Sequence, residues 1–268
     1  MKIARLLAAL LTLSLASPAV SQVTQLTPLA YDWTTDGIVT GAVAATVITL
    51  QLLKPELAPL ACKWCTPGSL DGDLARSVAW SNPKTASTLS DLMQFVLPIG
   101  AIGYGVLQGY RLGDPSAGWS SALLITQATS IALLANVIVK YAVGRQRPYV
   151  WLGQGDLYGD PRDENLSFFS GHTTLAFAVA VSAGTIFLMQ GMPGAGWVLG
   201  GGLALAAFTG YLRMGAEQHY LTDVLAGAAV GSLVGWAVPF LFHRPRKAGE
   251  PLQAGALLPA PGGITIAW

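Results

Sequence analysis

The chain has 268 residues, of which 52% are hydrophobic and only 11% are charged, and its formal net charge is +1. This apolar excess excludes an ordinary soluble domain and points to lipid as the surrounding solvent. The charges are sparse and scattered, so we expect no nucleic-acid partner, because binding a phosphate backbone requires a basic face.

The first 22 residues are typical of a signal sequence. Lys2 and Arg5 supply a positive start, an apolar stretch follows, and the small residues 19–21 resemble a cleavage site. The apolar stretch is also long enough for an uncleaved anchor, so cleavage stays open. In either case the chain is addressed to a membrane or beyond it.

Several later stretches approach the ~20 apolar residues that a membrane crossing needs. They are 37–53, 92–110, 119–139, 173–190, 195–212 and 221–242. The first is the weakest because it is short and rich in Ala, Thr and Gly. We therefore predict an all-α, polytopic membrane helical bundle of about six spans, with its active site at one membrane face. Its domain would cover 23–247, and the tail 248–268 has a composition typical of disorder.

Glycines recur at every fourth residue in the last two stretches. They are Gly196 and Gly200 in one, and Gly227, Gly231 and Gly235 in the other. Small residues at this spacing allow helix backbones to approach closely in lipid. We expect them to pack helices, not to bind a nucleotide, since no strand precedes them.

The densest basic cluster, 243–247, directly follows the last stretch and is predicted to be cytoplasmic. Counting back, the loops 54–91, 140–172 and 213–220 then lie together on the far face. A cleaved signal combined with a full crossing at 37–53 would reverse this count. We resolve the conflict in favour of the basic cluster and the cysteines, and predict a bacterial-type inner membrane with the active site facing the periplasm.

Cys62 and Cys65 form a C-x-x-C pair in the loop 54–91. A zinc site would need two more ligands, and a thioredoxin-like motif would need a βαβ context. We expect a small structural disulfide, or two idle thiols, outside the cytoplasm.

Three polar clusters stand at the ends of stretches on the same predicted face. They are Lys140 with Arg147, then Ser170, Gly171 and His172, then Arg213 with His219 and Asp223. A lone basic residue at a span end is usually an interfacial anchor, and a lone His-Asp pair usually stabilises a helix. These residues together, all on one predicted face, are hard to explain as anchors or helix stabilisers. They indicate a functional site.

These residue types suit a phosphate ligand. Lys140, Arg147 and Arg213 can offset the charge of a phosphoryl group, the arginines by bidentate donation. Ser170 is placed as an N-cap, which leaves the amides after it free to bind an anion. Gly171 lets the backbone approach the ligand closely.

His219 and Asp223 are four residues apart and would share a helix face if the last helix began near Glu217. The carboxylate would fix the tautomer and leave the other ring nitrogen as a nucleophile. His172 then remains to protonate the leaving oxygen. We expect no metal and no cofactor, because the cations and amides already supply transition-state electrostatics.

The pattern K-x6-R-P, S-G-H and R-x5-H-x3-D resembles the tripartite signature of the type 2 phosphatidic acid phosphatase and vanadium haloperoxidase superfamily, and the spans resemble its six-helix membrane branch. The resemblance implies hydrolysis of a lipid phosphate monoester or diphosphate through a phosphohistidine at His219. It also implies that Asp223 orients His219 and that His172 is the acid. The residues implied to bind phosphate are Lys140, Arg147, Ser170, Gly171 and Arg213.

Phe169 stands where the family usually has Pro, and Leu212 where it usually has Ser, so we expect altered substrate fit and retained chemistry. The segment 149–169 is predicted to act as a lid or head-group selector. One alternative is a vanadate-dependent haloperoxidase, which the apolar spans oppose. Another is a non-catalytic membrane protein that binds anionic head groups, which both histidines and Asp223 oppose. The lipid, the oligomeric state and the acceptor of the phosphoryl group, water or another lipid, stay open.

Overall fold

The computed structural model describes residues 25–245, so the predicted signal sequence and tail both lie outside the described residues. Six helices are long and apolar enough to cross a membrane. They are α2 (Trp33–Leu52), α5 (Pro83–Arg111), α6 (Pro115–Val143), α8 (Gly171–Gln190), α9 (Ala195–Gly215) and α10 (Leu221–Phe242). This confirms the predicted all-α membrane bundle, and no β-sheet is present between residues 25 and 245.

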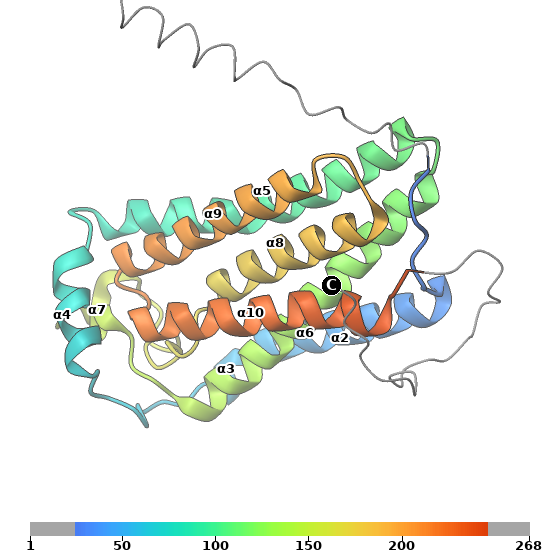
Figure 1. Ribbon diagram of the computed structural model, residues 1–268. Helices are drawn as coiled ribbons and strands as arrows, with labels where there is room; N and C mark the ends of the chain where they lie inside the picture. The colour runs from blue at the N-terminus through green and yellow to red at the C-terminus, as the bar shows by residue number, and fades with distance from the viewer. Residues whose placement is uncertain (1–24, 246–268) are drawn as a thin grey trace, which may run out of the picture.

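Short elements gather at one end of the bundle, where α4 and α7 lie beside the starts of α8 and α10 (Figure 1). These elements are α3 (Lys54–Leu57), α4 (Ser69–Val78), α7 (Pro148–Trp151) and the single 3-10 turn η1 (Gly155–Leu157). The described chain begins and ends at the opposite end, where Leu29 and Pro245 form an isolated bridge. The loops 54–91, 140–172 and 213–220 therefore share one end, as the sequence count placed them.

Polar caps explain where the long helices begin. Asp32, Asn82 and Asp114 each accept a hydrogen bond from the backbone amide three residues on, at 2.7, 3.3 and 3.0 Å. Proline follows the second and third of these caps in the first turn. Helices α5 and α6 thus start several residues before the predicted stretches 92–110 and 119–139, because their polar first turns are helical without being apolar.

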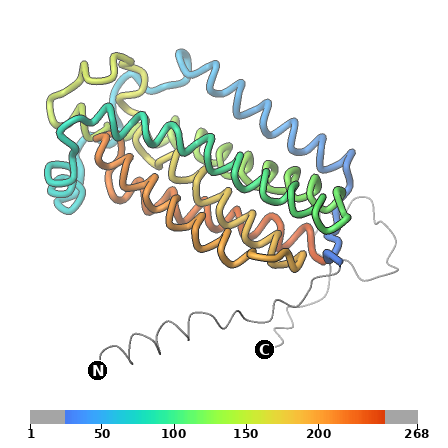
Figure 2. Tube along the Cα trace, turned by 90° about the horizontal axis from the view of Figure 1, so that it is seen from above, coloured from blue at the N-terminus to red at the C-terminus, as the bar shows by residue number. Residues whose placement is uncertain are grey.

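Helix α8 is the centre of the bundle and packs against α5, α6, α9 and α10. Helix α2 packs against α6 and lies at the edge of the bundle, as the view from above shows (Figure 2). The apolar core is built mainly from small and medium side chains of the central helices. The first residues of α8 are consequently surrounded by the ends of neighbouring helices.

The glycine stripe of α10 brings α10 against α8. A methyl group at Gly227, Gly231 or Gly235 would lie 2.7, 2.5 or 2.8 Å from the carbonyl oxygens of successive turns of α8. No side chain fits at those distances. Because the oxygen facing Gly227 belongs to Ser170, this stripe sets the position of the predicted anion-binding turn, and the packing role predicted for these glycines is confirmed.

The same expectation is wrong for α9. Among residues 25–245, nothing lies within 4 Å of a methyl group built on Gly196 or Gly200. A methyl group on Gly202 would lie 3.0 Å from Ala180, and one on Gly210 would lie 2.7 Å from Val224. A four-residue spacing defines a helix face, but it does not say whether that face meets a neighbour.

These two kinds of glycine predict opposite effects of alanine. Gly231→Ala should destabilise the protein by about 1–3 kcal/mol, because its methyl group meets the α8 backbone. Gly196→Ala should be neutral or stabilise it by up to about 1 kcal/mol, since alanine favours a helix and space is free. Thermal unfolding of the detergent-solubilised protein measures both, and equal shifts for the two variants would contradict the packing role of Gly231.

Candidate active site

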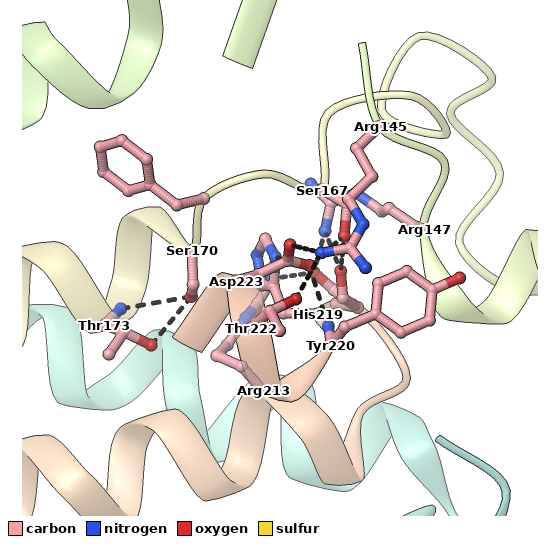
Figure 3. A network of polar contacts seen from close by, with 12 residues as sticks. Arg145, Arg147, Ser167, Ser170, Thr173, Arg213, His219, Tyr220, Thr222 and Asp223 are labelled. Carbon is pink, nitrogen blue, oxygen red and sulfur yellow. Dashed lines mark hydrogen bonds and ion pairs between the residues drawn. The ribbon is translucent and has the colours of Figure 1, made fainter. Parts of the chain in front are cut away.

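Every residue predicted to be catalytic or to bind phosphate lies at the α4–α7 end of the bundle. Lys140 is in the last turns of α6, Arg147 caps α7, Ser170 caps α8, Gly171 and His172 open α8, Arg213 is in the last turn of α9, His219 lies in the following turn and Asp223 is in the first turn of α10. Four membrane-length helices thus contribute side chains or caps, and Figure 3 shows most of these residues together.

The two predicted phosphate-binding arginines converge on one oxygen. Arg147 Nη1 donates to Gln218 Oε1 at 2.9 Å, and Arg213 Nη2 donates to the same atom. Arg213 Nη1 also donates to Ser90 Oγ at 3.0 Å. Guanidinium groups that share one acceptor atom are close enough to bind a single phosphoryl group.

The start of α8 carries two more of the predicted phosphate-binding residues, Ser170 and Gly171. Ser170 Oγ accepts from the Thr173 amide at 3.4 Å, as an N-cap does. A methyl group on Gly171 would lie 2.9 Å from Asn136 Oδ1 and 3.7 Å from Lys140 Nζ. The glycine therefore lets α6 and its lysine approach the positive end of the α8 dipole.

His219 does not lie on α10, and the predicted shared helix face is wrong. The helix begins at Leu221, so His219 belongs to the turn before it and Asp223 to the first turn. Glu217 has φ 54°, in the left-handed region, and reverses the chain between α9 and α10. The pair still meets, with His219 Nδ1 3.7 Å from Asp223 Oδ2.

The His219 ring is buried, at 2% exposure, and within residues 25–245 neither ring nitrogen has a hydrogen-bond partner. Burial, followed by the charges of Arg147, Lys140 and Arg213, holds the pKa of His219 well below its usual range. The imidazole is therefore neutral, which is the form that a nucleophilic nitrogen requires.

Asp223 is oriented by several donors. Its Oδ2 accepts from Ser167 Oγ at 2.5 Å and from the Tyr220 amide at 2.9 Å, and its Oδ1 accepts from Arg145 Nη1. Both oxygens of this buried carboxylate therefore accept hydrogen bonds (Figure 3). It presents one oxygen toward His219 Nδ1, which leaves Nε2 as the free nitrogen.

Arg145 connects this carboxylate to α4. Its Nη2 donates to Asp71 Oδ2 at 2.7 Å, and Asp71 Oδ1 accepts from the Thr222 amide at 3.1 Å. The guanidinium lies between two aromatic rings, 3.9 Å from the Trp64 centroid and 4.3 Å from the Tyr220 centroid. Arg145 thus joins α4, the segment after α6 and the start of α10.

Cys62 and Cys65 are joined by a disulfide. The short loop between them pairs with the end of α6: the Lys63 amide donates to Gly144 O at 2.9 Å, and the Gln146 amide donates to Trp64 O at 3.0 Å. The disulfide loop therefore places Trp64 over Arg145.

The segment 149–169 folds over the turn between α9 and α10. Tyr158 donates to Ala216 O at 2.6 Å, and Lys54 Nζ contacts Asp160 at 2.6 Å and Asp163 at 3.0 Å. Burial lowers the pKa of Lys54, but its bonds to these carboxylates raise it more, so it stays charged. These contacts hold the middle of the segment against the turn between α9 and α10 and against α3. Its role as a lid or selector stays a prediction.

Both departures from the family pattern have structural replacements. Phe169 is buried, and its carbonyl accepts from Asn136 Nδ2 at 2.7 Å, which fixes the turn before Ser170. Leu212 is fully buried and packs with Ala86 and Ala216. Apolar packing therefore occupies the position where the family usually has a serine hydroxyl.

Some residues of the site have no motif that predicts them. Asp91, Arg145 and Gln218 contact predicted site residues across long sequence separations, and Asp71 contacts Arg145. In the sequence, Asp71 lies in the loop 54–91, Asp91 at its end and Arg145 in the loop 140–172, and no motif marks any of them. A buried charge is recognisable only once its partners are known.

Membrane-length helices that gather three basic side chains, a helix N-terminus and a buried histidine at one end define an integral membrane protein with a cationic cluster at that end. The family model of the PAP2 superfamily matches residues 120–247. The fold is also similar to a transmembrane PAP2 type phosphatidylglycerolphosphate phosphatase from Bacillus subtilis, with a TM-score of 0.50 and 20% identity over 72% of this chain and 94% of that chain. The matched residues include all three motifs, from Lys140 to Asp223, and this match confirms the resemblance that the motifs predict.

Two curated relatives have related activities in their names. A lipid A 1-phosphatase of Porphyromonas gingivalis is 33% identical over 145 residues, which are 52% of this chain and 29% of that protein. An undecaprenyl-diphosphatase of Sulfolobus acidocaldarius is 30% identical over 104 residues, which are 39% of this chain and 47% of that protein. The chain thus spans less than half the length of either relative.

The environment of His219 predicts an abnormal titration. An ordinary histidine gains its proton near pH 6.5, but burial and cations disfavour the imidazolium here, so His219 should stay neutral as the pH falls well below about 6.5. Arg147→Gln removes one of these cations and should move the titration upward. The protein has three histidines, so histidine-labelled NMR can follow each ring, and His219→Gln assigns the signal. Normal titration of that ring would contradict the electrostatic account.

Proposed function

We propose that this protein is a membrane-embedded phosphatase that hydrolyses a lipid phosphate monoester or diphosphate through a phosphohistidine intermediate. The observation that carries the proposal is the convergence of Arg147 and Arg213 on one acceptor atom, next to the buried neutral ring of His219. Cations bind the phosphoryl group, and the uncharged ring nitrogen can attack it.

In the first step, His219 Nε2 attacks phosphorus and forms a P–N bond while the P–O bond to the leaving group breaks. His172 transfers a proton to the departing oxygen. Asp223, 3.7 Å from Nδ1 in the free site, approaches and stabilises the positive charge that the ring acquires. Arg147, Arg213 and Lys140 offset the charge of the transferring oxygens, together with the amides at the start of α8.

In the second step, water attacks the phosphorus of the phosphohistidine. His172, now neutral, accepts a proton from this water, the P–N bond breaks, and inorganic phosphate leaves. His219 is again neutral and His172 again carries its proton, so the site returns to its starting state.

The location of the site supports a lipid substrate. The site lies at the ends of membrane-length helices, where a head group meets the polar boundary of the bilayer. The names of the relatives and of the structural neighbour give three different lipid phosphates. What these substrates share is a phosphate on a membrane-anchored molecule, which is the substrate class proposed here.

His219→Ala should abolish phosphate release from a short-chain phosphatidic acid, with a loss of at least about 1,000-fold, because no nucleophile remains. The matched control is His243→Gln at the opposite end of the bundle, where His243 contacts Gln127 and the Ala30 carbonyl. This control should retain activity. Mass spectrometry of quenched enzyme should find phosphohistidine at His219 in the wild type. Full activity of His219→Ala would eliminate the mechanism, and head-group binding without turnover in the wild type would favour the non-catalytic alternative.

We further propose that the site faces the periplasm. Arg244 comes directly after α10, at the end opposite the site, and Arg246 and Lys247 follow it in the sequence. Basic residues favour the cytoplasmic side, and a disulfide favours an oxidising compartment. Counting α2 as a crossing then places the residues just before Trp33 on the cytoplasmic side as well.

A reporter that is active only in the periplasm tests this orientation. Fused after residue 247 it should be inactive, and inserted in the exposed turn at Gly153 it should be active. The reverse pattern would overturn the orientation and leave the proposed chemistry untouched.

A further inference from the structure

We propose that Asp91 of α5 is a positioning residue for the acid His172, and that it adapts the site to phosphate esters whose leaving group is an alcohol. The inference rests on the proposed phosphatase function and deepens it. Asp91 precedes residues 120–247, so it lies outside the part of the chain that the family model matches.

The contact between the two residues is direct. Asp91 Oδ1 lies 2.7 Å from His172 Nε2, and the side-chain amide of Gln94, one turn further along α5, lies 2.7 Å from the same nitrogen. The structure describes no hydrogen bond to the other ring nitrogen, Nδ1, among residues 25–245. A carboxylate only accepts, so this contact requires a proton on Nε2 and orients the ring, and Gln94 can face that N–H only with its amide oxygen. The proton on Nδ1 of an imidazolium is then the one available for transfer.

The charges around His172 explain why a carboxylate is needed. Arg213 of α9 lies on one side, with its Nη1 3.6 Å from Asp91 Oδ1, and Lys140 of α6 lies beside Gly171, the residue before His172. A proton on His172 adds a further positive charge next to these cations, which is unfavourable. Asp91 offsets part of that charge and so makes protonation of His172 less unfavourable.

The need for this proton depends on the leaving group. When a P–O bond to an alkyl group breaks, the oxygen would depart as a strongly basic alkoxide unless His172 protonates it. A phenolate such as p-nitrophenolate, or a phosphate released from a diphosphate, is weakly basic and can depart without the proton. A residue that acts through the acid should therefore affect alkyl esters far more than activated esters.

A second route from Asp91 to the reaction is through Arg213, which is predicted to bind the phosphoryl group. That route makes a different prediction, because both kinds of ester present the same phosphoryl group to Arg213. Its loss would weaken both substrates equally. The dependence on leaving group thus separates positioning of the acid from positioning of the arginine.

The test uses the purified full-length protein in mixed micelles with dioctanoyl phosphatidic acid and with p-nitrophenyl phosphate. The readout is kcat/KM, which includes all steps up to departure of the leaving group. Asp91→Asn should lower kcat/KM for phosphatidic acid by about 10- to 100-fold and for p-nitrophenyl phosphate by less than about 3-fold. Asp91 is 53% exposed, so the variant is expected to fold, and gel filtration checks this. The matched control is Asp73→Asn, an aspartate of α4 with 78% exposure, which should change neither value.

A double variant completes the test. His172→Gln removes the acid itself, so in that background Asp91→Asn should have almost no further effect on phosphatidic acid hydrolysis. Equal losses on both substrates, or independent losses in the double variant, would overturn the role of Asp91 while leaving the phosphatase function intact. A wild type that hydrolyses neither ester would overturn both.

Discussion

The buried ion pairs of Arg145 with Asp71 and Asp223 are the interaction on which the rest of the site depends. These side chains are 1%, 4% and 0% exposed, so each charge relies on its partners and not on water. Removing one member of such a cluster typically costs about 3–5 kcal/mol, because an uncompensated charge stays buried. Since Asp71 also accepts from the Thr222 amide, the cluster fixes the start of α10, and with it the turn that carries His219.

Helix packing in the membrane then brings the remaining parts of the site together. Glycines of α10 allow contact with the α8 backbone, and the Ser170 amide donates to the Asp223 carbonyl at 3.0 Å. Ser170, the N-cap residue of α8, is therefore joined directly to the first turn of α10. Side chains that arrive from different helices can reach one phosphoryl group because the ends of those helices are fixed relative to each other.

The two histidines, His219 and His172, have different electrostatic surroundings. His219 is buried among cations and faces a carboxylate at 3.7 Å, so it is neutral in the free site and gains stabilisation only as it becomes charged. His172 has a carboxylate at 2.7 Å, and its side chain is 18% exposed against 1% for His219. These different surroundings are what the proposed division into a nucleophile and an acid requires of two residues of the same type.

The sequence by itself determined the membrane class, the approximate positions of six spans and the residues of the three motifs. These depend on composition, local hydropathy and caps, which act over a few neighbouring residues. Three features follow instead from tertiary packing. His219 precedes α10, and Gly196 and Gly200 have no close neighbour among residues 25–245. Packing also selects which loop charges contact the site. Asp71 and Thr222 meet across 151 positions, and Asp91 and His172 across 81. Such contacts follow from how whole helices pack, and no spacing along the chain encodes them.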